Sequence, residues 1–188
     1  MNDGCFIVFE GIDGAGTTTQ AARFVARVRK IPRVAHLTNE PSTGPIGSML
    51  RLAMGGRLQL GGPRQAHLMA LLFAADRIDH VDQEVGPHLR DGSVVVSDRY
   101  DLSSIAYQTA TARDEPEDVA AWIRALNRYA VRPAATVVLD VTPSEAERRR
   151  KLRAGAPELY EEAPLQARLA ELYLRAETLL PPGDTVIH

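Results

Sequence analysis

The sequence contains one cysteine, no apolar run long enough to cross a bilayer, and no basic and apolar leader at its start. A single cysteine excludes a disulfide framework within the chain, and Cys5 lies in an apolar run that favours a small core residue. Residues 1–4 lack the regions that mark a signal peptide. We therefore expect a cytoplasmic protein that does not associate with membranes.

Lysine is also scarce, because Lys30 and Lys151 are the only two in 188 residues. The formal net charge of −2 gives no reason to expect nucleic acid or an anionic membrane as a partner. Hydrophobic residues make up 45% of the chain, which is enough for the core of one α/β domain. The sequence shows no repeat or linker, so we expect residues 1–188 to form a single domain.

Residues 11–18 (GIDGAGTT) match the phosphate-binding pattern G-x-x-x-x-G-K-[ST] at every position but one, where Thr17 replaces the lysine. Glycines allow successive N–H groups to turn inward around an anion, and the helix that follows adds unpaired amides and the positive end of its dipole. Polyphosphate is the expected ligand, with Thr18 placed to offer its hydroxyl to Mg²⁺. The alternative is an ordinary glycine-rich turn between a strand and a helix.

Apolar runs alternate with helical patterns along the whole chain. Continuous apolar runs are typical of parallel strands that are covered on both faces. The pattern therefore predicts an α/β fold with an open five-stranded parallel sheet flanked by helices. Strands are expected at residues 5–9, 34–37, 93–98, 136–140 and 185–187, and helices at 17–30, 46–54, 103–112, 116–129 and 165–180. A long helical region is expected from Leu68, with Pro87 and Asp91-Gly92 as its end, and another helix starts at Ser144.

Two charged segments are candidates for function. Asp98 and Arg99 follow the clearest buried strand, at the edge where doubly wound sheets bind ligands, although a surface ion pair is the simpler reading. The helix from Ser144 carries five basic residues between positions 148 and 153. Such a run is most often a solvated face, but beside a phosphate site it can act on the transferring group. Residues 154–164 then interrupt the helical pattern, as expected of a mobile lid.

Several blocks of the sequence, in order and with suitable spacing, resemble thymidylate kinases. They are residues 9–16 (FEGIDGAG), 40–41 with 44–47 (EP, GPIG), 73–77 (FAADR), 98–100 with 103–108 (DRY, SSIAYQ) and 139–141 (LDV). The resemblance implies a P-loop NTPase fold and transfer of the γ-phosphoryl group of ATP to dTMP, in the biosynthesis of dTTP. It also implies a requirement for Mg²⁺ and a homodimer, to which an apolar stripe from Leu68 to Ile78 could contribute if it is not a buried core face.

The resemblance implies roles for the matching residues. The ATP phosphates would be held by Gly11, Ile12, Asp13, Gly14, Ala15, Gly16, Thr17, Thr18 and Thr19, and Mg²⁺ would be organised by Thr18 and Asp98. The acceptor nucleotide would be bound by Asp13, Glu40, Pro41, Phe73, Arg77, Arg99, Ser104, Tyr107 and Gln108. In that set, Phe73 would stack on thymine and Arg77 would bond its edge, since a ring offers a π-face and a guanidinium a rigid donor fork.

The remaining implied roles concern the sugar and the phosphate of the acceptor. Asp13 would reach the sugar 3′-hydroxyl, and Tyr107 would disfavour a ribose 2′-hydroxyl. Arg99 would bind the acceptor phosphate beside Asp98.

Three positions depart from the family pattern, and each removes a cation. Thr17 replaces the loop lysine, Asn39 replaces an arginine often found there, and Leu159 stands where many bacterial relatives carry a catalytic arginine. Because phosphoryl transfer depends on charge neutralisation, one arginine can be worth about a thousandfold in rate. We expect a catalytic cation from the basic helix, most readily Arg153, with Arg149 or Lys151 as alternatives.

The sequence leaves three functions open. The first is an active dTMP kinase, favoured by the intact Asp98-Arg99 pair and the acceptor residues. The second is a catalytically weakened nucleotide-binding homologue, favoured by the loss of the lysine at Thr17. The third is a kinase for another deoxypyrimidine monophosphate, because Ser104 and Gln108 alone do not settle the acceptor.

Overall fold

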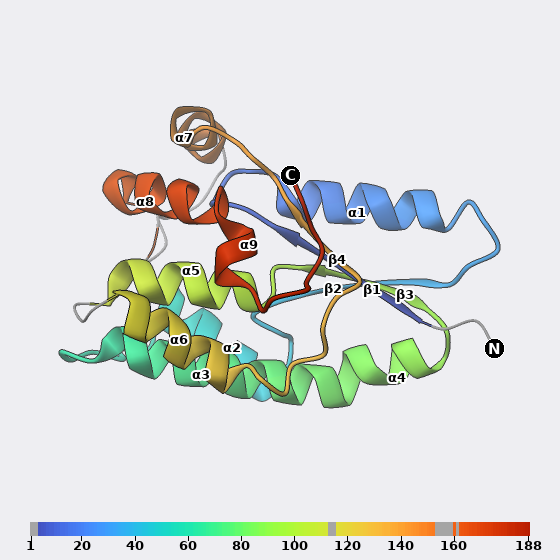
Figure 1. The fold of residues 1–188 in the computed structure, drawn as a ribbon, viewed down its shortest axis with the longest axis horizontal. Coiled ribbons are helices and arrows are strands. Elements are labelled where there is room, and N and C mark those ends of the chain that lie inside the picture. The colour runs from blue at the N-terminus through green and yellow to red at the C-terminus, as the bar shows by residue number, and fades with distance from the viewer. Residues whose placement is uncertain (1–3, 113–115, 153–159, 161) are drawn as a thin grey trace.

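The computed structural model describes residues 4–112, 116–152, 160 and 162–188. Its centre is a five-stranded sheet in the order β2-β3-β1-β4-β5, in which every neighbouring pair is parallel (Figure 1). The predicted parallel sheet is therefore confirmed. The strands are β1 (Cys5–Glu10), β2 (Ala35–Asn39), β3 (Val94–Asp98), β4 (Ala135–Val138) and β5 (Val186–Ile187).

The helices also follow the predicted order, with two differences. The long helix contains a π-helical turn at Val81–Val85 and then continues through Pro87 to Arg90, directly before Asp91-Gly92. Pro87 is tolerated because it lies in the first turn after the π-helical turn, where proline is favourable. The helix expected at 165–180 is divided by Arg175, whose φ of −119° leaves the helical region. The elements are α1 (Thr17–Val28), α2 (Pro45–Met54), α3 (Gln65–His80), η1 (Val81–Val85), α4 (Gly86–Arg90), α5 (Asp101–Thr111), α6 (Pro116–Leu126), α7 (Pro143–Lys151), α8 (Ala163–Tyr173) and α9 (Ala176–Leu179).

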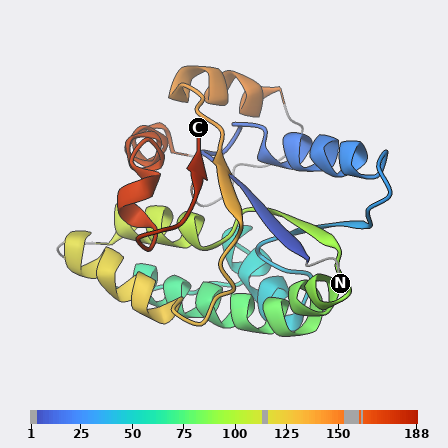
Figure 2. The ribbon, with the colours of Figure 1, turned by 45° about the vertical axis from the view of Figure 1, so that its right-hand side comes forward.

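Helices cover both faces of the sheet, as the continuous apolar strands predict (Figure 2). Because side chains alternate along a strand, β1 sends Phe6 and Val8 to the face covered by η1, and Phe9 to the face covered by α1. The core of the first face includes Val85, and that of the second includes Val25, both nearly inaccessible to solvent.

The register of the sheet brings three chain segments to one edge. Phe9 of β1 and Asn39 of β2 are both paired with Asp98 of β3. The segments that follow these strands therefore start side by side, at the carboxyl ends where open α/β sheets bind ligands. They carry the glycine-rich loop, Glu40 and Arg99.

The apolar stripe of α3 faces solvent. Leu71 and Ile78 are 48% and 47% exposed, whereas Met69 on the opposite side of the helix is fully buried against α2. On α2, Met49 and Leu52 are exposed as well. The stripe is thus not a core face. No helix in the described ranges is long and apolar enough to span a membrane.

Candidate active site

The glycine-rich loop between β1 and α1 has the backbone form that its sequence predicts. Gly14 and Gly16 have φ values of +94° and +102°, which residues with a Cβ rarely adopt. Gly16 is the left-handed residue just before α1, so the free amides of the helix start face the loop. Thr17 is buried and Thr18 is exposed at this helix start. The loop therefore has the geometry of an anion site without a lysine.

Arg99 connects this loop to the neighbouring pocket. Its guanidinium donates to the carbonyl oxygen of Gly11 at 2.8 Å and to Asp13 Oδ1 at 2.6 Å. It also bonds the hydroxyls of Ser103 and Tyr173, at 3.1 and 3.2 Å. Its φ of +73° is unusual for a residue with a side chain, and such strain is concentrated at functional sites.

Glu10 holds the residues around Arg99 in place through hydrogen bonds. Its buried carboxylate accepts hydrogen bonds from the backbone of Tyr100 at 2.8 Å and from the hydroxyl of Ser103 at 2.6 Å. The Tyr173 hydroxyl donates to it as well, at 3.2 Å. Burial raises the pKa of Glu10 to about 7, although the charge of Arg99 opposes this shift.

A second layer of contacts positions Asp13. The amide of Gln166 on α8 donates to Asp13 Oδ2 at 3.0 Å, and its oxygen accepts from the Asp13 backbone N–H at 3.1 Å. The same amide donates to the backbone oxygen of Tyr160 at 2.7 Å. Since Gln166 is fully buried, it holds the carboxylate of Asp13 in one orientation.

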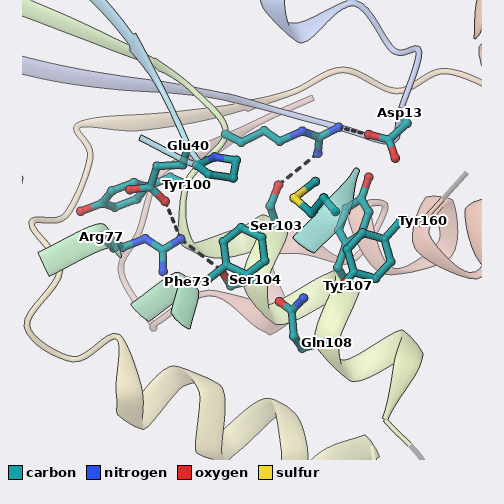
Figure 3. Close-up of a pocket in the computed structure, with 13 residues that line it drawn as sticks. Asp13, Glu40, Phe73, Arg77, Tyr100, Ser103, Ser104, Tyr107, Gln108 and Tyr160 are labelled. Carbon is teal, nitrogen blue, oxygen red and sulfur yellow. Dashed lines mark hydrogen bonds and ion pairs between the residues drawn. The ribbon is translucent and has the colours of Figure 1, made fainter. Parts of the chain in front are cut away.

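The pocket beside the loop is lined by side chains from α2, α3, α5 and four connecting segments (Figure 3). Phe73 and Arg77 of α3 lie one helical turn apart, so both face the same space. Across from them, α5 contributes four residues, and Tyr107 packs edge-on against Tyr160 at 5.3 Å between ring centroids. The lining residues are Asp13, Glu40, Pro41, Met54, Phe73, Arg77, Arg99, Tyr100, Ser103, Ser104, Tyr107, Gln108 and Tyr160.

Arg77 is held rigidly at the floor of this pocket. It donates to Glu40 at 2.6 Å, to Asn127 at 2.5 Å and to Ser104 at 3.1 Å. Burial alone would lower the pKa of Arg77, but the nearby carboxylates of Glu40 and Asp101 raise it above its ordinary value. The guanidinium is therefore a fixed charge, as planar recognition requires.

His80 shares the carboxylate of Glu40 with Arg77. Its Nδ1 lies 3.3 Å from Glu40 Oε1, and its Nε2 lies 2.7 Å from the Thr38 hydroxyl and 3.6 Å from Glu84. Burial works against the imidazolium, but Glu40, Glu84 and Asp76 together raise the pKa of His80 above its usual value. This histidine was absent from the predicted site.

Four residues that line the pocket carry buried polar atoms without a hydrogen-bond partner among the described residues. These atoms are Nε of Arg77, the hydroxyls of Tyr100 and Tyr107, and both amide atoms of Gln108. Buried polar groups are nearly always paired, so unpaired ones in a pocket point to a ligand that completes them. An arginine and an amide supply donors and one acceptor, which suits the edge of a nucleobase.

The structure brings most predicted site residues together in two adjoining groups. All nine predicted acceptor residues line the pocket. Residues 11–19 form the loop and the start of α1, with Asp98 beside them. Arg153, Leu159 and most of the predicted lid at 154–164 lie outside the described residues.

Sequence reasoning missed several contributors to the site. Met54, Tyr100, Ser103 and Tyr160 line the pocket, while Glu10, Gln166 and Tyr173 support it from behind. The helical spacing between Ser103 and Tyr107 could have indicated Ser103, because residues four apart share a face. Gln166 and Tyr173 carry no local signal, since their bonds to Asp13 and Arg99 span 153 and 74 positions of the sequence.

Comparison with known proteins agrees with this geometry. Residues 9–180 match the family model described as "Thymidylate kinase". The chain belongs to the thymidylate kinase family. It is 42% identical over 169 residues to a "Probable thymidylate kinase" from Pyrobaculum aerophilum, with 90% of this chain and 81% of the relative aligned. A protein of the same name from Thermococcus gammatolerans is 41% identical over 182 residues, covering 95% of this chain and 85% of its own length.

Asn39 is one of the three positions where the resemblance led us to expect that a cation is missing. Its side-chain amide donates to the carbonyl oxygen of Pro41 at 2.8 Å. Arg51 of α2 donates to the same oxygen at 3.0 Å, and also to Ser42 and Ser48. A cation thus reaches the segment after β2 from a helix instead of from position 39.

Proposed function

We propose that the chain transfers the γ-phosphoryl group of ATP to dTMP, giving dTDP and ADP. The observation that carries this proposal is the position of Arg99, which bonds Gly11 of the phosphate-binding loop and Asp13 of the acceptor pocket. One guanidinium therefore lies where donor and acceptor phosphates would meet. Since phosphoryl transfer requires positioning and charge neutralisation more than covalent chemistry, this is the arrangement that the reaction needs.

In this proposal the pocket binds dTMP. Phe73 stacks on the thymine ring, while Arg77, Ser104 and Gln108 bond its edge. Glu40 and Pro41 form the wall behind Arg77, as their contacts in the pocket support. Asp13 binds the sugar 3′-hydroxyl, and the Tyr107 ring takes the space that a 2′-hydroxyl would need.

Asp13 and Arg99 pair with each other in the structure, at 2.6 Å. A nucleotide whose 3′-hydroxyl bonds Asp13 and whose phosphate bonds Arg99 would share both partners of this ion pair. The pair thus keeps the two half-buried charges satisfied until the acceptor binds, so neither is left without a partner.

We infer that Mg²⁺ acts with ATP and is held by Thr18 and Asp98. The side chain of Asp98 has one oxygen 2.5 Å from the Thr18 hydroxyl and the other buried without a partner among the described residues. Oxygen ligands suit Mg²⁺, which usually takes one or two protein groups plus substrate phosphates. In the described ranges, no cluster of three His, Cys, Asp or Glu could hold a metal by itself. When bound, the ion would neutralise charge on the phosphates.

We also infer a homodimer that forms through α2 and α3. These helices pack against each other and leave Met49, Leu52, Leu68, Leu71 and Ile78 exposed. Side chains of this kind on adjacent helices fit a self-complementary interface better than a monomer surface.

The alternative is a nucleotide-binding protein with little catalysis, and the observation that favours it is Thr17. One assay separates these functions: ADP release measured with purified protein, ATP, Mg²⁺ and either dTMP, dUMP, dCMP or dGMP, beside a Thr17→Lys variant. Turnover with dTMP well above the other acceptors would support a dTMP kinase. Higher turnover with another pyrimidine would identify a different acceptor. Turnover only after Thr17→Lys would identify a nucleotide binder with an intact pocket.

A further inference from the structure

Three alternate carbonyl groups of the phosphate-binding loop each accept a hydrogen bond from an arginine. Arg99 bonds the oxygen of Gly11 at 2.8 Å, and Arg149 bonds the oxygen of Ala15 at 3.0 Å. Between them, Arg150 bonds the oxygen of Asp13. Two of the three arginines come from α7, so the basic run of that helix is not simply a solvated face.

Helix α7 is fixed against the loop by backbone packing. A Cβ added at Gly14 would lie only 2.5 Å from the carbonyl oxygen of Ala146, which is fully buried in α7. Such an approach is open only to glycine. Arg149, an alternative to Arg153 as the expected catalytic cation, contacts the loop in the structure, and so does its neighbour Arg150.

The position of Arg149 is close to the missing lysine. A Cβ added at Gly16, the residue before Thr17, would lie 3.8 Å from Nη1 of Arg149. Neither lysine of the chain takes that place: Lys30 follows the end of α1, and Lys151 pairs with Glu147 at 2.7 Å with its side chain 73% exposed.

We propose that Arg149 and Arg150 replace, from outside the loop, the positive charge that a lysine at position 17 would supply to a nucleoside triphosphate. This inference rests on the proposed function, because it assumes that the loop binds ATP. Both arginines are positioning residues, since they act on the triphosphate through the peptide groups of the loop and through their electrostatic field.

The peptide groups of the loop explain how charge outside it reaches an anion inside. The carbonyl of Asp13 and the N–H of Gly14 belong to one peptide unit, as do the carbonyl of Ala15 and the N–H of Gly16. A guanidinium bound to the carbonyl polarises the unit and makes its N–H a stronger donor. The two positive charges also offset the electrostatic repulsion among the negative phosphate groups that the loop would bind, in a site partly shielded from water.

The experiment combines charge removal with restoration of the lysine. The double variant Arg149→Gln, Arg150→Gln keeps N–H donors for the loop carbonyls but removes both charges. Binding of ATP with Mg²⁺ is measured by calorimetry without an acceptor, and kcat is measured with dTMP. We expect the double variant to lose about 10- to 100-fold in ATP affinity and in kcat. Adding Thr17→Lys to it should restore most of both losses.

The matched control is Arg148→Gln. Arg148 shares the carboxylate of Glu145 with Arg149, and its Nε and Nη2 both bond that carboxylate and not a loop carbonyl. This control variant should change both quantities by less than about twofold. An unchanged double variant would overturn the inference, as would a loss that Thr17→Lys does not restore, because the arginines would then act on another part of ATP or on the fold. If the native chain binds ATP without turnover, the proposed function fails, while the binding data still decide the role of the arginines.

Discussion

The hydroxyl of Thr18 lies 2.5 Å from Oδ2 of Asp98 and joins the start of α1 to the end of β3. Two residues 80 positions apart therefore form the oxygen pair that we assign to Mg²⁺. We predict that Asp98→Asn lowers kcat about 100-fold or more and raises the Mg²⁺ concentration needed for half-maximal rate. A titration of rate against Mg²⁺ measures both. Asp82→Asn, which removes an exposed carboxylate from η1, is the control and should leave both values unchanged.

We predict that α7 packs against the phosphate-binding loop only when residue 14 is glycine. Gly14→Ala forces a Cβ into the carbonyl of Ala146 at 2.5 Å and strains a φ of +94°. We expect a fall in the thermal midpoint of several degrees and a loss of ATP affinity of at least tenfold, because the loop and α7 must separate. Gly61→Ala makes the same chemical change in open space and should leave both unchanged. Equal behaviour of the two variants would show that α7 does not constrain the loop.

Phe73 is predicted to contribute binding of the acceptor base. Loss of a stacking ring costs about 1–3 kcal/mol per base, so Phe73→Ala should raise KM for dTMP about 10- to 100-fold with a smaller effect on kcat. Phe73→Leu keeps apolar volume without a π-face and should recover only part of the loss. Initial rates at varied dTMP and saturating ATP measure the effect; full recovery by leucine would exclude stacking.

Glu10 should make the stability of the fold depend on pH. Its pKa is about 7 in the folded chain, against an ordinary value of 4.5. The folded state therefore binds more protons between these values, and the free energy of unfolding must fall as pH rises from 4.5 to about 7. At about 1.4 kcal/mol per pKa unit, the change attributable to Glu10 is up to roughly 3 kcal/mol.

Denaturant unfolding at several pH values tests this slope by comparison with Glu10→Gln, which cannot titrate. His80, whose pKa is also raised, adds a slope of the same sign, but it remains in both proteins and cancels in the difference. Parallel curves for the two proteins would show that the carboxylate of Glu10 does not titrate in this range.

Leu71 tests the proposed dimer. It is 48% exposed on α3, and a glutamate there would place charge in the interface. Leu71→Glu should convert the protein to a monomer in light scattering at concentrations where the native chain is a dimer. Leu174→Glu, at a leucine that is 60% exposed at the end of α8, should leave the mass unchanged. A native chain that is already monomeric would refute the interface.

The sequence by itself determined the sheet and the place of the glycine-rich loop. The apolar run of β3 and the glycines of the loop are local signals. A strand is recognised from the pattern of adjacent residues, and a positive φ from the glycine at that position. Once five parallel strands are recognised, Asp98 and Arg99 must lie at the edge that binds ligands. The resemblance to thymidylate kinases added nine residues predicted to bind the acceptor, and all nine line one pocket.

Only the tertiary structure decided which faces are covered and which distant groups meet. The stripe from Leu68 to Ile78 has the same periodicity whether it packs in a core or remains exposed, and the fold left it exposed. The contacts of Arg149 and Arg150 with the loop depend on α7 packing against Gly14, more than 130 residues away. Local sequence fixes backbone conformation. The position of the arginine charges that we propose in place of the lysine absent at Thr17 depends instead on the packing of whole elements.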